Sequence, residues 1–288
     1  MSAKIIDGIA IAREVRVGIA ERAAALKARG IFPALTVILV GDDPASSVYV
    51  RNKVRACREV GIKSEVVRFA ADIAESQLLD RIRALNEIAG VHGILVQLPL
   101  PPHISVRRVV ETISAAKDVD GFHLYNVGGL VIGQTVFPPC TPYGVQKILE
   151  HEGIELEGKN VTVVGASNIV GKPLALMLMQ REATVAICHA KTRDLAQYTI
   201  LSDILVVAAG SPNLIVPAMV RTGAVVIDVG INFLPDGRLV GDVDFEGVRR
   251  KASHITPVPG GVGPMTVTML LENTVGAAER ASGGVGSS

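Results

Sequence analysis

Two side chains that can exchange protons or stack on a ring follow the apolar segment at residues 35–40. Tyr49 and Lys53 are four residues apart, so one helix, expected over residues 46–60 with Ser46 as its N-cap, places them on the same face. The apolar segment has the pattern of a buried strand, and open α/β sheets bind ligands beyond the carboxyl ends of their strands. A phenol and an amine at this position could bind a substrate and transfer protons. The alternative is an amphipathic helix with a solvated lysine and a half-buried tyrosine.

A further buried strand is expected to end at the same edge. The apolar run at residues 92–98 is stopped by prolines and places Gln97 at its carboxyl end. Another strand is expected at residues 62–69, and helices at residues 8–30, 76–89 and 105–114. This alternation of strands and helices predicts a largely parallel sheet. Gln97 is therefore expected near the helix that carries Lys53.

A second candidate site is rich in glycine. A strand at residues 161–164 is followed by Gly165, and a helix is expected at about 170–180. A glycine permits the tight turn, Ser167 offers a hydroxyl, and the helix N-terminus offers N–H groups to a pyrophosphate. The glycine spacing is not G-x-G-x-x-G, so the standard dinucleotide fingerprint is absent. A tight strand-to-helix turn without a cofactor would also favour glycine here.

The end of the next expected strand, residues 184–188, indicates the type of dinucleotide. A site for NAD usually places an acid about 20 residues after the loop, where it binds the ribose hydroxyls. Here the segment contains His189, Lys191 and Arg193 and no acid. These cations favour a 2′-phosphate and hence NADP, with a solvated basic turn as the alternative.

The composition is that of an ordinary globular protein. A chain of 288 residues suggests two domains, at the usual size of roughly 150 residues each. The chain is 49% hydrophobic and has a net charge of +1, so no bulk field favours nucleic acid or an acidic membrane. The six histidines show no ligand spacing, which predicts no metal site. Three widely separated cysteines without a C-x-x-C pair fit a reducing cytoplasm.

The order of the elements predicts an α/β fold with two α/β domains around a cleft, of which the C-terminal one is a Rossmann-type parallel sheet. A stretch rich in Gly and Pro at residues 127–142 marks the junction. We expect residues 1–140 to form one domain, completed by a C-terminal helical segment at about 266–288. Residues 141–265 form the other, with strands at 161–164, 184–188, 204–208 and 224–229.

Five motifs in order resemble one enzyme family from about residue 4 to residue 280. They are Asp43-Pro44-Ala45-Ser46 with Tyr49 and Lys53, Gly93-Ile94-Leu95-Val96-Gln97-Leu98-Pro99-Leu100-Pro101, Lys117-Asp118-Val119-Asp120-Gly121-Phe122, Gly165-Ala166-Ser167-Asn168-Ile169-Val170-Gly171-Lys172-Pro173 and Pro259-Gly260-Gly261-Val262-Gly263-Pro264-Met265-Thr266. Together they resemble the bifunctional methylenetetrahydrofolate dehydrogenase/methenyltetrahydrofolate cyclohydrolase family.

The resemblance implies an enzyme of one-carbon metabolism, which serves purine, histidine and methionine biosynthesis. It implies oxidation of 5,10-methylenetetrahydrofolate with NADP and hydrolysis of the methenyl product to 10-formyltetrahydrofolate. It also implies a cytoplasmic homodimer joined through the dinucleotide domain.

The resemblance assigns roles to individual residues. Lys53 is the central catalytic group, Gln97 positions it, Tyr49 stacks on the aminobenzoyl ring of folate, and Asp120 binds the polar edge of the pterin. The folate site also contains Val96, Leu98, Pro259, Gly260 and Gly261, and a loop at residues 260–266 closes it. The NADP site contains Gly165, Ala166, Ser167, Ile169, Ala190, Lys191, Thr192 and Ile231. Ala190 stands where many relatives have serine, which removes one hydroxyl that could bind the 2′-phosphate; Thr192 with Lys191 or Arg193 could replace it.

Three other functions fit parts of the sequence. Tyr49 and Lys53 match the Y-x-x-x-K pattern of short-chain dehydrogenases, but in those enzymes the cofactor loop precedes the pair, whereas here it follows. A monofunctional dehydrogenase would retain the cofactor loop without the hydrolysis. A non-catalytic sensor of NADP or folate would not need the lysine.

Overall fold

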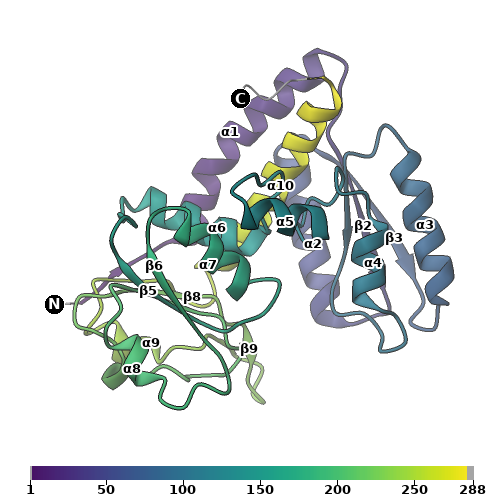
Figure 1. The fold of residues 1–288 in the computed structure, drawn as a ribbon. Helices are drawn as coiled ribbons and strands as arrows, with labels where there is room; N and C mark the ends of the chain where they lie inside the picture. Colours follow the sequence, from purple (N-terminus) through teal and green to yellow (C-terminus); the bar gives the residue numbers. More distant parts are fainter. Residues whose placement is uncertain (1, 284–288) are drawn as a thin grey trace. The chain divides into compact units, whose positions relative to one another are not determined.

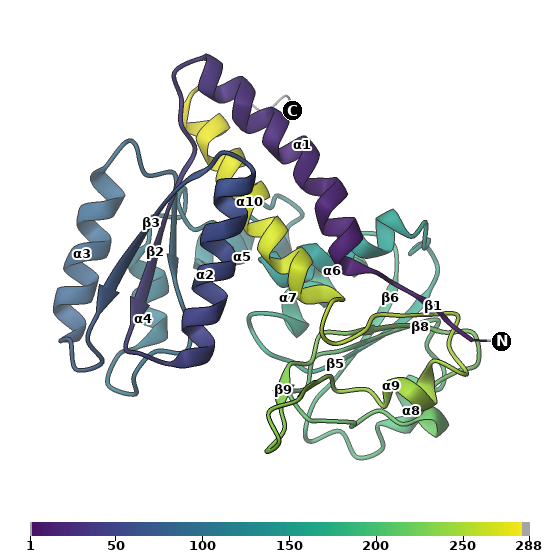
Figure 2. The same ribbon diagram turned by 180° about the vertical axis from the view of Figure 1, so that it is seen from behind.

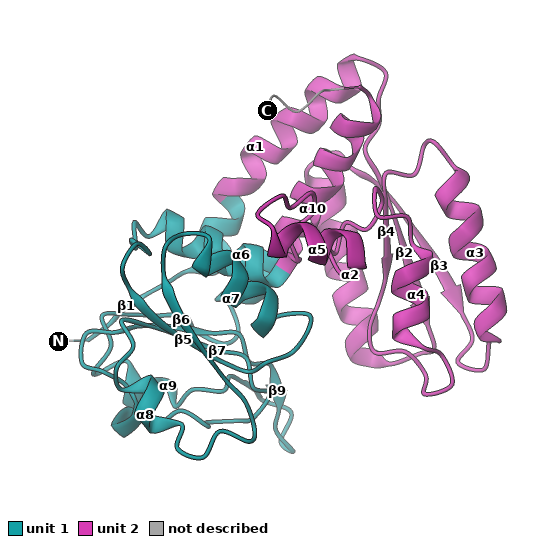
Figure 3. Ribbon diagram, in the orientation of Figure 1, with its two compact units in different colours: residues 1–13, 141–266 teal, residues 14–140, 267–288 magenta. Residues whose placement is uncertain are grey.

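The computed structural model describes residues 2–283, which form two compact units (Figures 1 and 3). Unit 1 contains the described residues up to Arg13 together with Thr141–Thr266. Unit 2 contains Glu14–Cys140 and the described residues from Val267 onward. The last five residues of the predicted C-terminal segment, 284–288, lie outside the described residues.

Unit 2 is built on a three-stranded parallel sheet with the order β3-β2-β4. Its strands are β2 (Ala34–Val40), β3 (Lys63–Phe69) and β4 (Gly93–Val96), and its helices include α2 (Pro44–Glu59), α3 (Glu75–Glu87) and α4 (Val106–Thr112). Apolar side chains of β2 and β4 form one core with those that α3 and α4 turn inward. The parallel sheet and the strand–helix alternation of this unit agree with the expectation from sequence.

Helix α2 begins earlier than predicted. Its N-cap is Asp43 rather than Ser46, and the Asp43 carboxylate accepts a 2.7 Å hydrogen bond from the Ser46 backbone N–H. Pro44 occupies the first turn, where its missing N–H costs no hydrogen bond. Ser46 is buried inside the first turn. The aspartate is a better cap here because its side chain reaches the N–H three residues on.

Unit 1 contains a six-stranded sheet with the order β1-β11-β8-β7-β5-β6, all of whose pairs are parallel. The strands are β1 (Lys4–Ile5), β5 (Asn160–Val164), β6 (Thr184–Cys188), β7 (Ile204–Val207), β8 (Val225–Asp228) and β11 (His254–Ile255). The helices are α6 (Cys140–His151), α7 (Gly171–Met179), α8 (Ala196–Thr199) and α9 (Phe245–Val248), with a 3₁₀ turn η1 (Pro217–Met219). The hairpin of β9 (Asn232–Phe233) and β10 (Leu239–Val240) is antiparallel. A Rossmann-type parallel sheet was predicted for this segment.

Strand β1 was not predicted. It pairs in parallel with β11, so the start of the chain lies in the sheet of unit 1 rather than with residues 14–140. Two residues are too few to show a strand pattern in the sequence, because the alternation of side chains needs about four.

The segment rich in Gly and Pro at residues 127–142 contains part of a helix, α5 (Leu124–Val131), that was not expected. His123 caps it, since its Nδ1 accepts a 3.1 Å hydrogen bond from the Tyr125 N–H. Gly129 is needed inside it, because a Cβ there would lie 2.6 Å from the Gln134 carbonyl oxygen. One of the glycines that suggested a loop, Gly129, therefore serves close packing.

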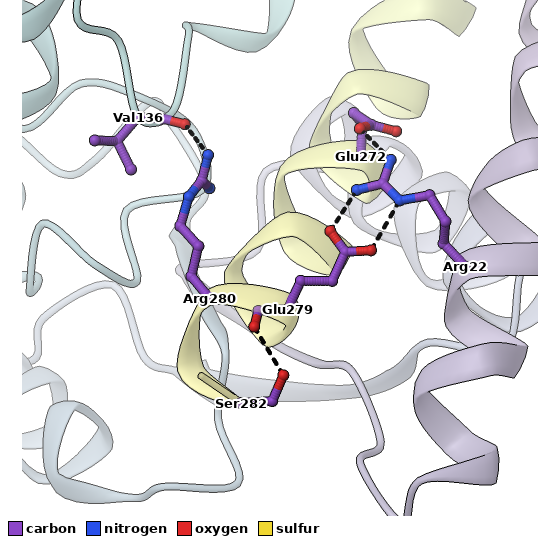
Figure 4. Close-up of polar contacts among 6 residues, drawn as sticks. All are labelled: Arg22, Val136, Glu272, Glu279, Arg280 and Ser282. Carbon is purple, nitrogen blue, oxygen red and sulfur yellow. Dashed lines mark hydrogen bonds and ion pairs between the residues drawn. The ribbon is translucent and has the colours of Figure 1, made fainter. Parts of the chain in front are cut away.

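Two long helices, α1 (Gly8–Ala28) and α10 (Val262–Ala281), begin in unit 1 and continue into unit 2. The predicted loop at residues 260–266 is helical from Val262 onward, so that prediction was wrong by about one turn. Within unit 2 the two helices lie side by side (Figures 1 and 2) and are joined by Arg22. Its guanidinium donates to both carboxylate oxygens of Glu279, at 2.9 and 2.7 Å. It also donates to Glu272, which lies about two turns earlier on α10 (Figure 4).

Helix α10 is also joined to the segment after α5. Arg280 donates a 3.0 Å hydrogen bond to the Val136 carbonyl (Figure 4). Its guanidinium also lies 4.7 Å from the centre of the Phe137 ring. Phe137 is among the largest fully buried side chains of the protein.

Within residues 2–283, every helix is too short or too polar to cross a membrane.

The Arg22 contact predicts a measurable loss of stability on substitution. Arg22→Met keeps an apolar stem but removes a bidentate, charge-assisted contact. Because solvent screens this half-exposed contact, the free energy of unfolding should fall by only about 1–2 kcal/mol. Arg83→Met is the control, because Arg83 pairs only with the exposed Asp80 three residues earlier and should cost about 0–0.5 kcal/mol. Urea unfolding of the three proteins measures the difference. Equal losses for the two variants would contradict this account.

Candidate functional site

Lys53 and Gln97 are brought together at the carboxyl edge of the unit 2 sheet. The Lys53 Nζ donates a 3.0 Å hydrogen bond to Gln97 Oε1, and Gln97 Nε2 donates a 2.7 Å bond to the Leu98 carbonyl. The second bond determines which end of the amide faces the lysine. The parallel pairing of β2 with β4 explains the meeting, because α2 follows β2 and Gln97 follows β4. Both side chains are half-buried.

Tyr49 lies one turn before Lys53 on α2 and is also half-buried. Burial raises the pKa of the Tyr49 hydroxyl, so it remains protonated at neutral pH. A neutral phenol ring can stack on an aromatic ligand and donate a hydrogen bond.

Asp120 lies in a pocket of unit 2 together with two other predicted folate-site residues, Val96 and Leu98. The lining is completed by apolar side chains of β4 and α4 with Asp118 and Phe122. Burial raises the pKa of the Asp120 carboxyl, the positive charge of Lys53 lowers it, and the charge of Asp118 raises it further. The influence of Lys53 on this carboxyl links the pocket electrostatically to the lysine.

The loop that carries Asp120 is held by residues that the sequence did not single out. Asn273 of α10 donates from Nδ2 to the Val119 carbonyl at 2.8 Å and to the Pro138 carbonyl at 3.0 Å. The Cys140 thiol donates to the same Val119 carbonyl at 3.3 Å. Burial raises the pKa of this thiol well above its usual range, so it stays protonated. Gly121 has a φ of +79°, and a Cβ there would lie 2.6 Å from the Phe137 carbonyl oxygen.

A local signal for part of this arrangement exists in the sequence. A glycine directly after the acid, as at Gly121, indicates a turn or a close approach. No local signal identifies Asn273, because it lies 154 residues from the carbonyl that it binds.

The glycine-rich loop of unit 1 has the geometry of a cofactor cradle. Gly165 follows β5 with a φ of +119°, and a Cβ there would lie 2.1 Å from the Ala208 carbonyl oxygen. A Cβ on Gly171, at the start of α7, would lie 1.8 Å from the Gly165 carbonyl oxygen. Ser167 Oγ accepts hydrogen bonds from the Val170 and Gly171 N–H groups, at 3.1 and 3.4 Å, just before and at the start of α7. Ile169, on the same loop, is exposed.

The turn after β6 carries Ala190, Lys191 and Thr192. The Thr192 hydroxyl accepts a 3.0 Å hydrogen bond from the His189 N–H, and the Thr192 N–H donates to the His189 carbonyl at 2.8 Å. These bonds form a compact turn in which Ala190 and Lys191 are exposed. Ile231, in the loop after β8, is also exposed.

The predicted site residues thus fall into separate groups. Tyr49, Val96, Gln97, Leu98 and Asp120 belong with Lys53 to unit 2, and the predicted NADP residues belong to unit 1. Pro259, Gly260 and Gly261, which were predicted to contact folate, belong to unit 1. Among residues 2–283, His, Cys, Asp and Glu side chains form no group of three that could hold a metal ion.

Comparison with known families agrees with this division. The model of the tetrahydrofolate dehydrogenase/cyclohydrolase catalytic domain matches residues 6–120. The model of the NAD(P)-binding domain of the same family matches residues 139–282.

Curated relatives match over nearly the whole chain. The bifunctional protein FolD of Paracidovorax citrulli is 58% identical over 98% of this chain and 100% of its own length. The FolD protein of Nitrosospira multiformis is 60% identical over 98% of both chains.

Solved structures give the same result. The bifunctional FolD enzyme of Campylobacter jejuni superposes with a TM-score of 0.95 at 52% identity, covering 97% of this chain and 99% of the other. The Trypanosoma brucei enzyme, complexed with NADP and an inhibitor, superposes with a TM-score of 0.94 at 39% identity, covering 98% and 99%. These matches confirm the resemblance found in the sequence, and the chain belongs to the tetrahydrofolate dehydrogenase/cyclohydrolase family.

Proposed function

We propose that this chain oxidises 5,10-methylenetetrahydrofolate with NADP and hydrolyses the resulting 5,10-methenyltetrahydrofolate to 10-formyltetrahydrofolate. The observation that carries the proposal is the 3.0 Å hydrogen bond between Lys53 Nζ and Gln97 Oε1 at the carboxyl edge of a parallel sheet. Membership of the family supports both activities. On this proposal unit 2 binds the folate and unit 1 binds NADP.

The two steps make different demands on the protein. NADP, when bound, would supply the hydride acceptor for the oxidation of the methylene bridge to a methenyl cation. Residues of this chain need only align the methylene carbon for that step. Water must then add to the same carbon, and its protons must be removed and delivered as the ring opens. This second step requires an acid–base group in contact with the substrate.

Lys53 is the group that we assign to proton transfer. Its amine has three hydrogen-bonding positions, and the structure shows one of them directed to Gln97. The amide orients the amine while adding no negative charge, so the lysine is not held as one half of an ion pair. A neutral acceptor suits a group that must both gain and lose a proton.

Asp120 is the group that we assign to the polar edge of the pterin. The pocket that it lines is otherwise mostly apolar, as a flat heteroaromatic ring requires. An acid in its lining can accept hydrogen bonds from ring N–H and amino groups. Tyr49, on the same helix as Lys53, would stack on the aminobenzoyl ring.

The residues of unit 1 fit NADP. The close backbone contacts at Gly165 and Gly171 require glycine and hold the loop in a tight turn before α7. N–H groups at the N-terminus of this helix would bind the pyrophosphate. Ala166, Ser167 and Ile169 would line this loop, and Ile231 would contact the cofactor from the loop after β8. Lys191 and Thr192 would bind the 2′-phosphate, with Ala190 supplying only backbone.

We also propose that the enzyme is a cytoplasmic homodimer. Strand β6 pairs only with β5 among the described strands and so lies at an edge of its sheet. Ile187 on this strand is 43% exposed, and the segment that follows exposes Tyr198, Ile200 and Leu201. An exposed apolar edge favours pairing with a second copy. The cytoplasmic location is supported by three buried cysteines that remain free thiols.

A monofunctional dehydrogenase is the alternative. It would need the cofactor loops and the folate pocket, but not a lysine placed for proton transfer. The Lys53–Gln97 contact favours the bifunctional enzyme, and the same contact argues against a sensor without catalysis.

The first prediction concerns Lys53. Lys53→Ala should lower the rate of methenyl hydrolysis by roughly 10²–10⁴-fold, the usual contribution of a general acid–base group, and should affect oxidation less. The methenyl absorbance would then accumulate with NADP and decay slowly. Arg55→Ala is the control on the same helix, since the Arg55 side chain is 75% exposed and pairs only weakly with Glu59. Near-normal hydrolysis by Lys53→Ala would refute the assignment.

The second prediction concerns the choice of cofactor. The protein should have a higher kcat/KM with NADP than with NAD. Lys191→Met should raise the KM for NADP by about 10-fold, because one charge-assisted contact to the 2′-phosphate is lost. The KM for NAD should change little, since NAD has no 2′-phosphate. Arg250→Met removes the same charge from an exposed position of unit 1 and should leave both values unchanged. Equal use of the two cofactors by the unmodified protein would overturn this specificity.

The third prediction concerns assembly. Ile187→Lys places a charge on the exposed edge strand and should weaken dimerisation by at least about 10-fold, as light scattering over a dilution series would measure. Val17→Lys, on the exposed face of α1, makes the same change outside unit 1 and should leave the assembly intact. A monomeric unmodified protein, or a dimer unaffected by Ile187→Lys, would contradict the proposed interface.

A further inference from the structure

Two carboxylates of unit 1 that take no part in the proposed chemistry are almost completely buried. Asp242 is 0% exposed and Asp228 is 3% exposed. They lie at the carboxyl edge of the six-stranded sheet, where β8 ends at Asp228 and the chain leaves β10 just before Asp242. Among residues 2–283, neither forms an ion pair with a cation; both are surrounded by N–H donors.

Asp242 accepts four hydrogen bonds, three from one loop and one from the first residue of β9. The backbone N–H groups of Ala209, Gly210 and Ser211 donate to its carboxylate at 2.6, 2.9 and 2.8 Å. The fourth comes from Asn232 Nδ2 at 2.8 Å. Three successive backbone N–H groups directed at one anion form a concavity of the kind that binds phosphate. Here the protein fills that concavity with its own carboxylate.

Asp228 performs the same task for the neighbouring loop. It accepts backbone hydrogen bonds from Gly230 at 2.9 Å and from Asp242 and Val243 at 3.0 Å each. Burial raises the pKa of Asp228 to about 6, although these backbone N–H groups act in the opposite direction. The Asp228 N–H is itself held by Thr256 Oγ1 at 2.7 Å.

The loops around the two carboxylates leave no space for additional atoms. A Cβ on Gly230 would lie 2.3 Å from the Asp242 carboxyl carbon, and a Cβ on Gly241 would lie 1.9 Å from Asp228 Oδ2. Because the surroundings are this tight, the carboxylates determine the positions of the backbone that they bind.

Both loops touch the parts of unit 1 assigned above to NADP. The loop held by Asp242 follows Ala208, whose carbonyl oxygen is the atom that a Cβ on Gly165 would meet at 2.1 Å. The loop held by Asp228 leads through Gly230 directly to Ile231. Displacement of either carboxylate would therefore move a surface on which the cofactor rests.

We propose that Asp242, supported by Asp228, is a positioning residue for NADP. The two carboxylates fix the loops at residues 208–211 and 228–231 and occupy their N–H groups, so these groups do not bind a phosphate. The pyrophosphate is thereby directed to the Gly165 loop. This inference rests on the proposed NADP site. The chemistry requires an anion rather than an amide, since all four partners are donors. An asparagine would place its own NH₂ group against at least one of them.

The test is Asp242→Asn in the full-length chain. The Kd for NADP, measured by calorimetric titration, and the KM for NADP should each rise by about 5- to 100-fold, the range expected when a buried donor loses its acceptor. Hydrolysis of methenyltetrahydrofolate without NADP should stay within about twofold, because unit 2 carries that chemistry. Asp236→Asn is the matched control, since Asp236 is an exposed residue of the β9–β10 hairpin and should change neither quantity.

A second variant keeps the inference testable if Asp242→Asn does not fold. Asn232→Ser removes one of the four donors to Asp242 and should weaken NADP binding by about threefold, with hydrolysis unchanged. Unchanged NADP binding in a folded Asp242→Asn protein would overturn the inference while leaving the proposed function intact. Equal losses of NADP binding and hydrolysis would show a purely structural role and would also overturn it. An unmodified protein that does not bind NADP would overturn the proposed function and this inference together.

Discussion

Parallel strand pairing is the constraint on which both candidate sites depend. In unit 2 the register pairs Ile38 with Val96, and the Gln97 N–H continues the ladder with a 2.9 Å bond to the Ile38 carbonyl. Gln97 is therefore positioned by backbone hydrogen bonds before its side chain makes any contact. In unit 1 the register pairs Val164 with Val207 and Val207 with Asp228. The loops that begin at Gly165, Ala208 and Val229 consequently start at the same level of the sheet.

The two sites use opposite solutions to the pairing of buried polar groups. In unit 2 a lysine must remain able to change its charge, and it meets the neutral oxygen of Gln97. In unit 1 the loops present N–H donors with no other partner, and two carboxylates accept them. Burying a carboxylate is costly, as the raised pKa of Asp228 indicates, but each buried donor left unpaired would cost about 1–3 kcal/mol. By accepting several donors, each carboxylate offsets part of this cost.

Much of the fold follows from local patterns in the sequence. The apolar runs predict the longer strands of both sheets to within about two residues, but not the two-residue strands β1 and β11. The succession of strand and helix predicts the parallel direction. The errors have local physical causes. Asp43 rather than Ser46 caps α2 because its side chain reaches the Ser46 N–H. Helix α5 was missed because a glycine that serves close packing, as Gly129 does, has the same sequence signal as a glycine in a loop.

The supporting residues of the sites could not be predicted in this way. Asn273 binds a carbonyl 154 residues away, and Asp242 binds N–H groups 31 to 33 residues earlier. Their roles depend on tertiary contacts, and a single asparagine or aspartate in a sequence gives no sign of its partner. By contrast, Gln97 directly follows a strong strand pattern, and Lys53 lies on the helix that follows another. Both could therefore be placed at one edge of the sheet, and the family resemblance assigned their roles.

The segment Pro259–Gly261 shows how a motif with a predicted ligand role can have a structural one as well. A Cβ on Gly8, the first residue of α1, would lie 1.8 Å from the Gly261 carbonyl oxygen. Gly261 itself is crowded by the Pro257 carbonyl at 2.6 Å and by the Thr256 side chain at 2.7 Å. Helices α1 and α10, which both run from unit 1 into unit 2, thus begin at the same tight backbone contact. This contact requires glycine at positions 8 and 261 whether or not folate binds. The presence of Gly261 is therefore weaker support for a substrate contact than the Lys53–Gln97 hydrogen bond.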